Sequence, residues 1–139
     1  MLISLKTDSI KQTSQNVFKL NFNMPTLILD DHKYTVALRS MIIDLTDVPP
    51  DLLISLTTTI IDRNALNPCQ QLYSTVLTTL TGSNYIMCEP TLPLRYKIQT
   101  PNLCDSEFIL RVRDNSEIPK LEPNKVDIII EVQRDARFQ

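Results

Sequence analysis

The sequence predicts an all-β domain, an antiparallel β-sandwich of about eight or nine strands, on three observations. Apolar and polar residues alternate in three segments of the last third of the chain, at 94–99, 108–113 and 126–133. Because successive side chains of a strand point to opposite faces, such alternation indicates strands with one buried face. Helical periodicity is scarce elsewhere. Finally, one glycine and nine prolines favour long loops over tight hairpins, which predicts a Greek-key or jelly-roll-like sandwich.

The elements upstream follow from the same reasoning. The segment 7–15 is polar and is expected to form a turn, whereas the prolines at 49 and 50 mark a loop. At 72–80, Leu72, Val76 and Leu80 would share a helical face, but the β-branched residues favour a strand. At most one short helix is expected, between Asp62 and Leu80. The expected strands are 1–6, 18–24, 34–45, 52–61, 72–80, 85–89, 94–99, 108–113 and 126–133.

The alternation also predicts which side chains face the core. Within each strand, the apolar residues that occupy every second position should point inward. The predicted inward residues are Phe18, Leu20, Phe22, Tyr34, Val36, Leu38, Phe108, Leu110, Val112, Ile128 and Ile130.

Length, charge and composition restrict the possible classes of protein. A chain of 139 residues fits a single domain, 1–139, and its net charge of −2 gives no reason to expect nucleic-acid binding. No apolar run reaches the roughly 18 residues of a membrane span, and the first residues do not resemble a signal peptide. The odd number and wide spacing of Cys69, Cys88 and Cys104 predict thiols in a reducing compartment.

No catalytic, metal or cofactor site is predicted, and no small-molecule substrate is expected. Cysteine or serine catalysis would need the one histidine, His32, which falls in a polar turn with no cysteine near it in sequence. Asp30 and Asp31 could bind a hard cation, but adjacent aspartates before a strand are more often a turn.

Basic residues gather at outward positions of two segments in the last third. They are Arg95, Lys97, Arg111 and Arg113. They could contact nucleic acid or an acidic partner. Alternatively, they could pair across the sheet with Asp127 and Glu131. The matching charges in the same region favour this second alternative.

Two isoleucines interrupt the polar face of otherwise alternating strands. Ile109 stands beside Arg111 and Arg113, and Ile129 stands between acidic residues. These isoleucines could form the apolar centre of a subunit contact, with arginine in its rim, or they could lie under a covering loop. The predicted interface residues are Ile109, Arg111, Arg113 and Ile129.

The C-terminal third resembles a known family. An aromatic segment (PLRYKIQ) is followed by an alternating strand that ends in aspartate (FILRVRD), a polar stretch with Ile-Pro (NSEIPKLEPNK) and a closing apolar strand (VDIIIEV). This pattern resembles the closing strands of β-sandwich virion proteins of Polinton-like and adintovirus-like DNA viruses and their integrated relatives. Near the start, FKLNFNMPTLILDDHKYTVALRSMII resembles the openings of those proteins. Glu117 stands in a region where that family usually has glycine.

The resemblance implies a non-enzymatic structural protein of a virion, as a capsid, vertex or spike subunit. Such a chain would act as a homo-oligomer with other virion proteins, and would be made in the host cytoplasm or nucleus rather than secreted. The alternative is an intracellular β-sandwich module that recognises a peptide or a glycan. A small hydrolase using His32 is a third possibility.

Overall fold

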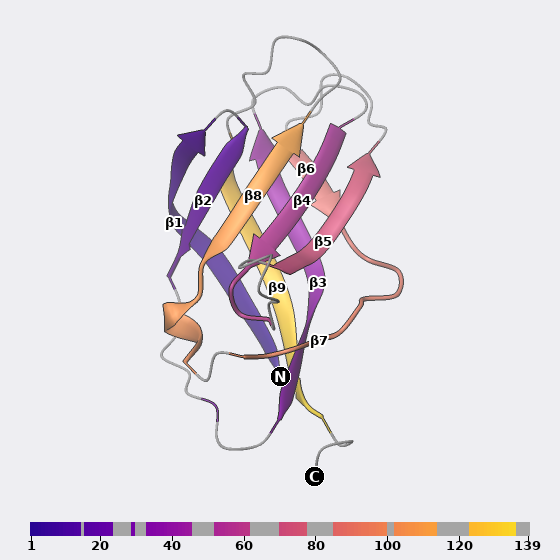
Figure 1. Ribbon diagram of the computed structural model, residues 1–139. Helices are drawn as coiled ribbons and strands as arrows, with labels where there is room; N and C mark the ends of the chain where they lie inside the picture. The colour runs from indigo at the N-terminus through magenta and orange to yellow at the C-terminus, as the bar shows by residue number, and fades with distance from the viewer. Residues whose placement is uncertain are drawn as a thin grey trace.

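The computed structural model describes residues 1–14, 16–23, 29, 33–45, 52–61, 70–77, 85–99, 102–113 and 123–135. Within these ranges the chain forms nine β-strands and one short 3₁₀ helix, and every strand pairing is antiparallel (Figure 1). The prediction of an antiparallel all-β fold is therefore confirmed. The elements are β1 (Leu2–Ser14), β2 (Val17–Phe22), β3 (Tyr34–Leu45), β4 (Leu52–Thr58), β5 (Gln70–Leu77), β6 (Tyr85–Cys88), β7 (Tyr96–Lys97), η1 (Leu103–Asp105), β8 (Phe108–Arg113) and β9 (Pro123–Arg134).

The strands form one continuous sheet that curls around its core. Its order is β5-β4-β8-β2-β1-β9-β3-β6, with β7 also pairing with β3. The strand β1 belongs to both halves, because its residues 2–6 pair with β9 and its residues 7–14 pair with β2. We call β2, β8, β4 and β5 the β8 half, and β9, β3, β6 and β7 the β9 half. Figure 1 shows the β8 half lying in front of β9 and β3, so the two halves form layers.

The pairings are nested along the chain. The strand β1 pairs with β9, β2 pairs with β8, β3 pairs with β6, and β4 pairs with β5. The early strands are thus matched to the late strands in reverse order, as in a long hairpin that has been rolled up. Further pairings, such as β3 with β9 and β4 with β8, join the nested pairs into the curled sheet.

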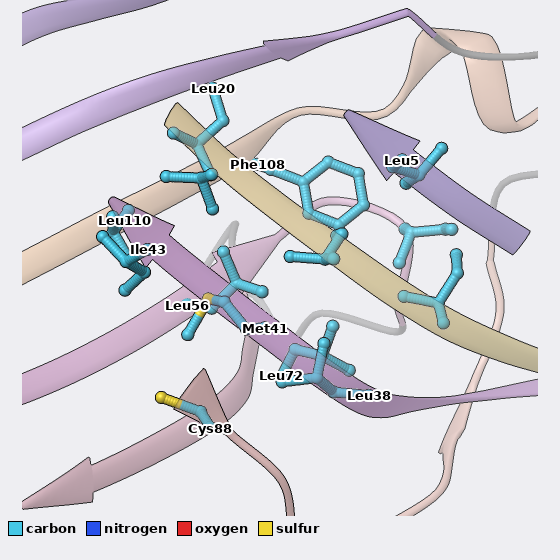
Figure 2. Packing of buried hydrophobic residues seen from close by; sticks show 14 of the residues in the cluster. Leu5, Leu20, Leu38, Met41, Ile43, Leu56, Leu72, Cys88, Phe108 and Leu110 are labelled. Carbon is cyan, nitrogen blue, oxygen red and sulfur yellow. The ribbon is translucent and has the colours of Figure 1, made fainter. Parts of the chain in front are cut away.

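Side chains from both halves fill one core. Figure 2 shows Leu56 and Leu110 from the β8 half reaching towards Met41 and Ile43 of β3. The predicted inward parity is confirmed: nine of the eleven predicted residues are buried, and Phe22 and Tyr34 are partly buried against the same cluster. The rings of Phe22 and Phe108 meet edge to face, with centroids 5.2 Å apart, in a geometry favoured by the ring quadrupoles.

An irregularity in β3 lets both of its ends bury apolar residues. The pairing with β9 shifts register between Leu38 and Ser40, which marks a bulge at Arg39. The extra residue changes the parity, so Leu38 and Met41 both point into the core although three positions separate them.

The prediction of a turn at 7–15 was wrong, because β1 continues to Ser14 and pairs with β2 along most of that length. Within residues 7–14 of β1, only Thr7 and Ile10 are even partly buried, so both faces of this part of the strand are mostly polar. The segment therefore has no alternation of apolar and polar residues that could reveal a strand. Asn16 follows with a φ of 61°, in the left-handed region that asparagine tolerates better than most residues. It occupies a hairpin position that glycine often takes.

One other expectation needs correction. The segment 94–99 is not a full strand: only Tyr96–Lys97 form β7, and a single bridge joins Ile98 to Ile61. A short helix was expected between Asp62 and Leu80. Of that range, 62–69 and 78–80 lie outside the described residues, and 70–77 form a strand that pairs with β4. The helix within the described ranges is η1.

Candidate interaction surface

Exposed apolar side chains are concentrated around the β9 half. Among the described residues, nine large apolar side chains are exposed, and Leu53 on β4 is the one that belongs to the β8 half. The other eight lie at the N-terminus, on β1, β3, β6 or β9, or in the segment that joins β6 to β7. They are Met1, Leu2, Ile42, Tyr85, Met87, Leu92, Leu94 and Ile129. Scattered exposed apolar residues need no explanation, but a cluster of this kind is typical of an interaction site.

Four of these residues form a contiguous group on the outer face, which we call the outer patch: Ile42, Tyr85, Met87 and Ile129. Ile42 on β3 lies directly opposite Met87 on β6, and Tyr85 is two residues away from Met87 on the same strand face. Ile129 on β9 lies opposite Ser40, which places it diagonally next to Ile42. Directly opposite Cβ atoms are about 4.5–5.5 Å apart and diagonal ones about 7–8 Å. The outer patch therefore crosses three strands.

A second apolar feature lies at the edge of the outer patch. Residues 89–95, which we call the arm, join β6 to β7, and Figure 1 shows this connection swinging out from the side of the sheet. Leu92 is 85% exposed and Leu94 is 69% exposed, the largest values among the exposed apolar residues. Prolines at 90 and 93 restrict the backbone of the arm, so the leucines are presented by a stiff segment.

One arginine fixes the end of the arm to the sheet. The Arg95 Nη1 lies 2.9 Å from the Glu131 carboxylate, and its Nε donates a 3.0 Å hydrogen bond to the Thr35 hydroxyl. The Arg39 guanidinium also approaches Glu131, at 3.6 Å, and the Gln133 amide donates to the same carboxylate. Because the Glu131 side chain is only 16% exposed, these charge-assisted contacts are partly shielded from water.

Among the described residues, the predicted charge pairing is found between Arg95 and Glu131. Arg95 pairs with Glu131, as expected, and Asp127 pairs with Lys125 of its own strand at 3.7 Å. Arg111 lies in the β8 half, where its guanidinium donates to the Thr57 hydroxyl.

The structure separates the predicted interface residues. Ile129 is exposed in the outer patch. Ile109 is partly buried on β8, between Lys19 and Thr57 of the neighbouring strands, and Arg111 is exposed beside it. Arg113 ends β8, and its side chain lies outside the described residues. Because β2 and β1 stand between β8 and β9, Ile109 and Ile129 point to opposite outer faces. The alternation along a strand shows which of its side chains point outward, but it does not show which half of the sheet the strand joins.

Five exposed residues of this surface were missed in the sequence: Ile42, Tyr85, Met87, Leu92 and Leu94. A signal existed at two of them, because Ile42 and Met87 each lie within a run of apolar residues that covers both faces of a strand. Such runs also occur in strands buried on both sides, so the signal is ambiguous without the sheet order.

A small cavity lies at the opposite side of the fold, where β2 approaches η1. It has a volume of about 120 Å³ and is lined by Lys19, Leu20, Asn21, Phe22, Cys104, Ser106, Glu107 and Phe108. The Lys19 ammonium lies 3.4 Å from the Glu107 carboxylate, and the buried Ser106 hydroxyl has no hydrogen-bond partner in the described part of the chain. This space suits a few water molecules or a small polar group.

In the described ranges, no three histidine, cysteine or acidic side chains gather in a way that could hold a metal ion. His32, Asp30, Asp31 and Cys69 lie outside these ranges. Within the same ranges no helix has the length and apolar character needed to cross a membrane.

The two described cysteines should react very differently with an alkylating reagent. Both are thiols; Cys104 is exposed and Cys88 is buried in the core. Because accessibility controls reaction with a soluble reagent, Cys104 should be modified in the folded protein and Cys88 only after unfolding. Mass spectrometry of peptides after brief iodoacetamide treatment checks this, with treatment in denaturant as the control. Equal rates for both thiols in the folded protein would contradict the placement of Cys88.

No protein-family model matches the chain, and no curated protein matches it.

Proposed function

We propose that this chain is a non-enzymatic structural subunit of a virion and that it acts by oligomerising. The observation that carries the proposal is the gathering of exposed apolar side chains on and beside the β9 half. A protein that works alone in water gains nothing from this surface, whereas a subunit buries it against its neighbours.

The strand connectivity supports the virion part of the proposal. Nested pairing of early with late strands is the connectivity of a jelly roll, in which a long hairpin wraps into two facing layers. Viral capsid proteins commonly use this architecture, although lectin and cupin domains use it as well. The resemblance of the C-terminal strands to β-sandwich virion proteins favours the first of these classes.

Charge substitution in the outer patch should weaken assembly. Ile129→Lys places an ammonium in a surface that the oligomer would bury, which is costly without a partner charge. Leu53→Lys is the matched control, since Leu53 is 38% exposed and Ile129 is 37% exposed, but Leu53 lies in the β8 half. We expect Ile129→Lys to raise the dissociation constant about tenfold or more, which corresponds to roughly 1.4 kcal/mol. Leu53→Lys should leave it unchanged.

Light scattering and native mass spectrometry over a wide concentration range measure this effect. Circular dichroism verifies that each variant keeps its β-structure. Equal assembly of Ile129→Lys and wild type would exclude the outer patch as the interface. A wild-type chain that stays monomeric at high concentration would contradict the proposal and would favour the alternative, a module that binds a peptide or a glycan.

A further inference from the structure

We infer that two copies of this chain pack face to face through the outer patch, across a two-fold axis, so that the same surface of each copy covers that of the other. The inference rests on the proposed function, because it names the partner and the symmetry of the contact through which the subunit oligomerises. A subunit can also bind its neighbour through two different surfaces, which builds rings or filaments. Contact through the same surface closes at a dimer instead.

The apolar surface of the outer patch continues onto β1. Leu2 is 64% exposed and lies opposite Glu131, which places it diagonally next to Ile129 on β9. With Leu2, the outer patch becomes a diagonal band across β1, β9, β3 and β6, which we call the outer stripe. Ser4 and Ser40 lie on either side of Ile129, and these small side chains let a facing surface approach the isoleucine closely. The outer stripe therefore crosses the whole outer face of this side of the molecule.

The size of the outer stripe fits a dimer interface. At about 200 Å² for a fully accessible large side chain, the stripe leaves roughly 500 Å² of surface exposed, and Leu92 and Leu94 of the arm add about 300 Å². A standard interface buries about 800 Å² on each partner, of which a little over half is apolar. The stripe alone therefore supplies the apolar share of such an interface. The arm lies at its edge, where the same contact covers the two leucines.

The distribution of exposed apolar residues favours contact between identical surfaces. A contact between two different surfaces would need a second apolar region on the other copy. Among the described residues, Leu53 is the one large apolar side chain that is exposed away from the β9 half and its neighbour β1. In the described part of the chain, the outer stripe of one copy is therefore matched only by the outer stripe of another.

The charges beside the stripe do not oppose contact between identical faces. A face that carried a single sign of charge would repel its own copy. Here both signs occur together: Glu131 is approached by Arg39 and Arg95, and Asp127 pairs with Lys125. Because these groups are paired within each chain, they neither repel a second copy nor select a partner of opposite charge. The apolar stripe is therefore the part of this face that determines what binds to it.

Cross-linking through single introduced cysteines tests the inference. In a two-fold contact, residues at the middle of the stripe meet the same residues of the other copy, whereas in a contact between different surfaces they do not. Thiols held side by side react far faster than thiols that meet by diffusion. In a background with the exposed Cys104 replaced by serine, Ile42→Cys should therefore give about tenfold or more cross-linked dimer than Leu53→Cys after brief treatment with a short bis-maleimide.

The controls use positions of similar exposure. Leu53 is the matched control, since Ile42 is 36% exposed and Leu53 is 38% exposed. The Cys104→Ser chain without a new cysteine gives the background from the remaining thiols. Adding Ile129→Lys to Ile42→Cys should remove the excess of cross-linked dimer, because the added ammonium would be buried without a partner. Ile129→Cys is the second variant if Ile42→Cys does not fold.

The outcomes separate this inference from the proposed function. An excess of cross-linked dimer at Ile42 or Ile129 over Leu53 supports both. Oligomers in which neither position cross-links more than Leu53 would overturn the same-surface contact and leave the structural-subunit proposal standing, with a contact between different surfaces. A protein that is monomeric at every concentration and gives only the background of cross-linking would overturn both.

Discussion

Replacing Leu110 by alanine should lower the free energy of unfolding by about 2–5 kcal/mol. Leu110 is fully buried on β8, opposite Phe18 of β2 on one side and Leu56 of β4 on the other. Truncation removes three carbon atoms from a closely packed region, and the surrounding strands can only partly fill the cavity that remains. Ile128→Ala on β9 should have a similar effect, because Ile128 is also fully buried and faces the same core from the other half.

Leu53→Ala on β4 is the control for the core truncations. Leu53 is 38% exposed on the outer face, so its removal should cost well under the value for Leu110, at about 1 kcal/mol or less. Urea unfolding followed by circular dichroism gives the free energies, and an unchanged slope shows that the comparison is between similar unfolded states. Values near zero for both Leu110→Ala and Ile128→Ala would show that the strand register is incorrect.

Glu131→Gln should destabilise the fold by about 1–2 kcal/mol and loosen the arm. The substitution keeps the shape of the side chain and removes the charge that holds both Arg95 and Arg39. Because the Glu131 side chain is only 16% exposed, water screens these pairs less than it screens an ordinary surface pair. Amides near β7 should then exchange faster, since Arg95 immediately precedes that strand.

Glu107→Gln is a suitable comparison for Glu131→Gln. It removes one ion pair, with Lys19, in which both side chains are 40% exposed or more. Exposed pairs of this kind contribute about 0–1 kcal/mol, so the loss should be small. If Glu131→Gln were no more destabilising than Glu107→Gln and left exchange near β7 unchanged, Arg95 would not be what fixes the arm.

The sequence predicted the strands whose two faces differ. Alternation placed Leu110 and Ile128 in the core correctly, because a one-residue error would expose every apolar residue of those strands. It failed at residues 7–14 of β1, where a paired strand has water on most of both faces and therefore has no pattern. The alternation failed again at 94–99. Leu94 fits the alternating pattern of apolar residues there, but it lies in the arm and is 69% exposed.

The candidate site could be predicted only in part, for a different reason. Ile129 was recognised as an outward apolar residue, and it lies in the outer patch. Its neighbours there come from β3 and β6, and its register with them is fixed by pairings between segments far apart in the chain. Ile109 gives the same local signal but belongs to the opposite outer face. Local patterns report the face of a strand, whereas a surface patch depends on the strand order.

The position of β9 between β1 and β3 has a consequence for how the chain acquires its structure. Leu2 pairs with Glu131, and the residues of β3 pair with the same strand from its other side. Until β9 has been synthesised, both β1 and β3 lack a neighbour, and the sheet cannot be continuous. Contacts between such distant segments require costly loop closure before they contribute, which slows folding to the range of milliseconds to seconds. During synthesis on the ribosome, the curled sheet can therefore become continuous only after residues 123–134 have emerged. Until then, the nascent chain has open strand edges, which chaperones could shield.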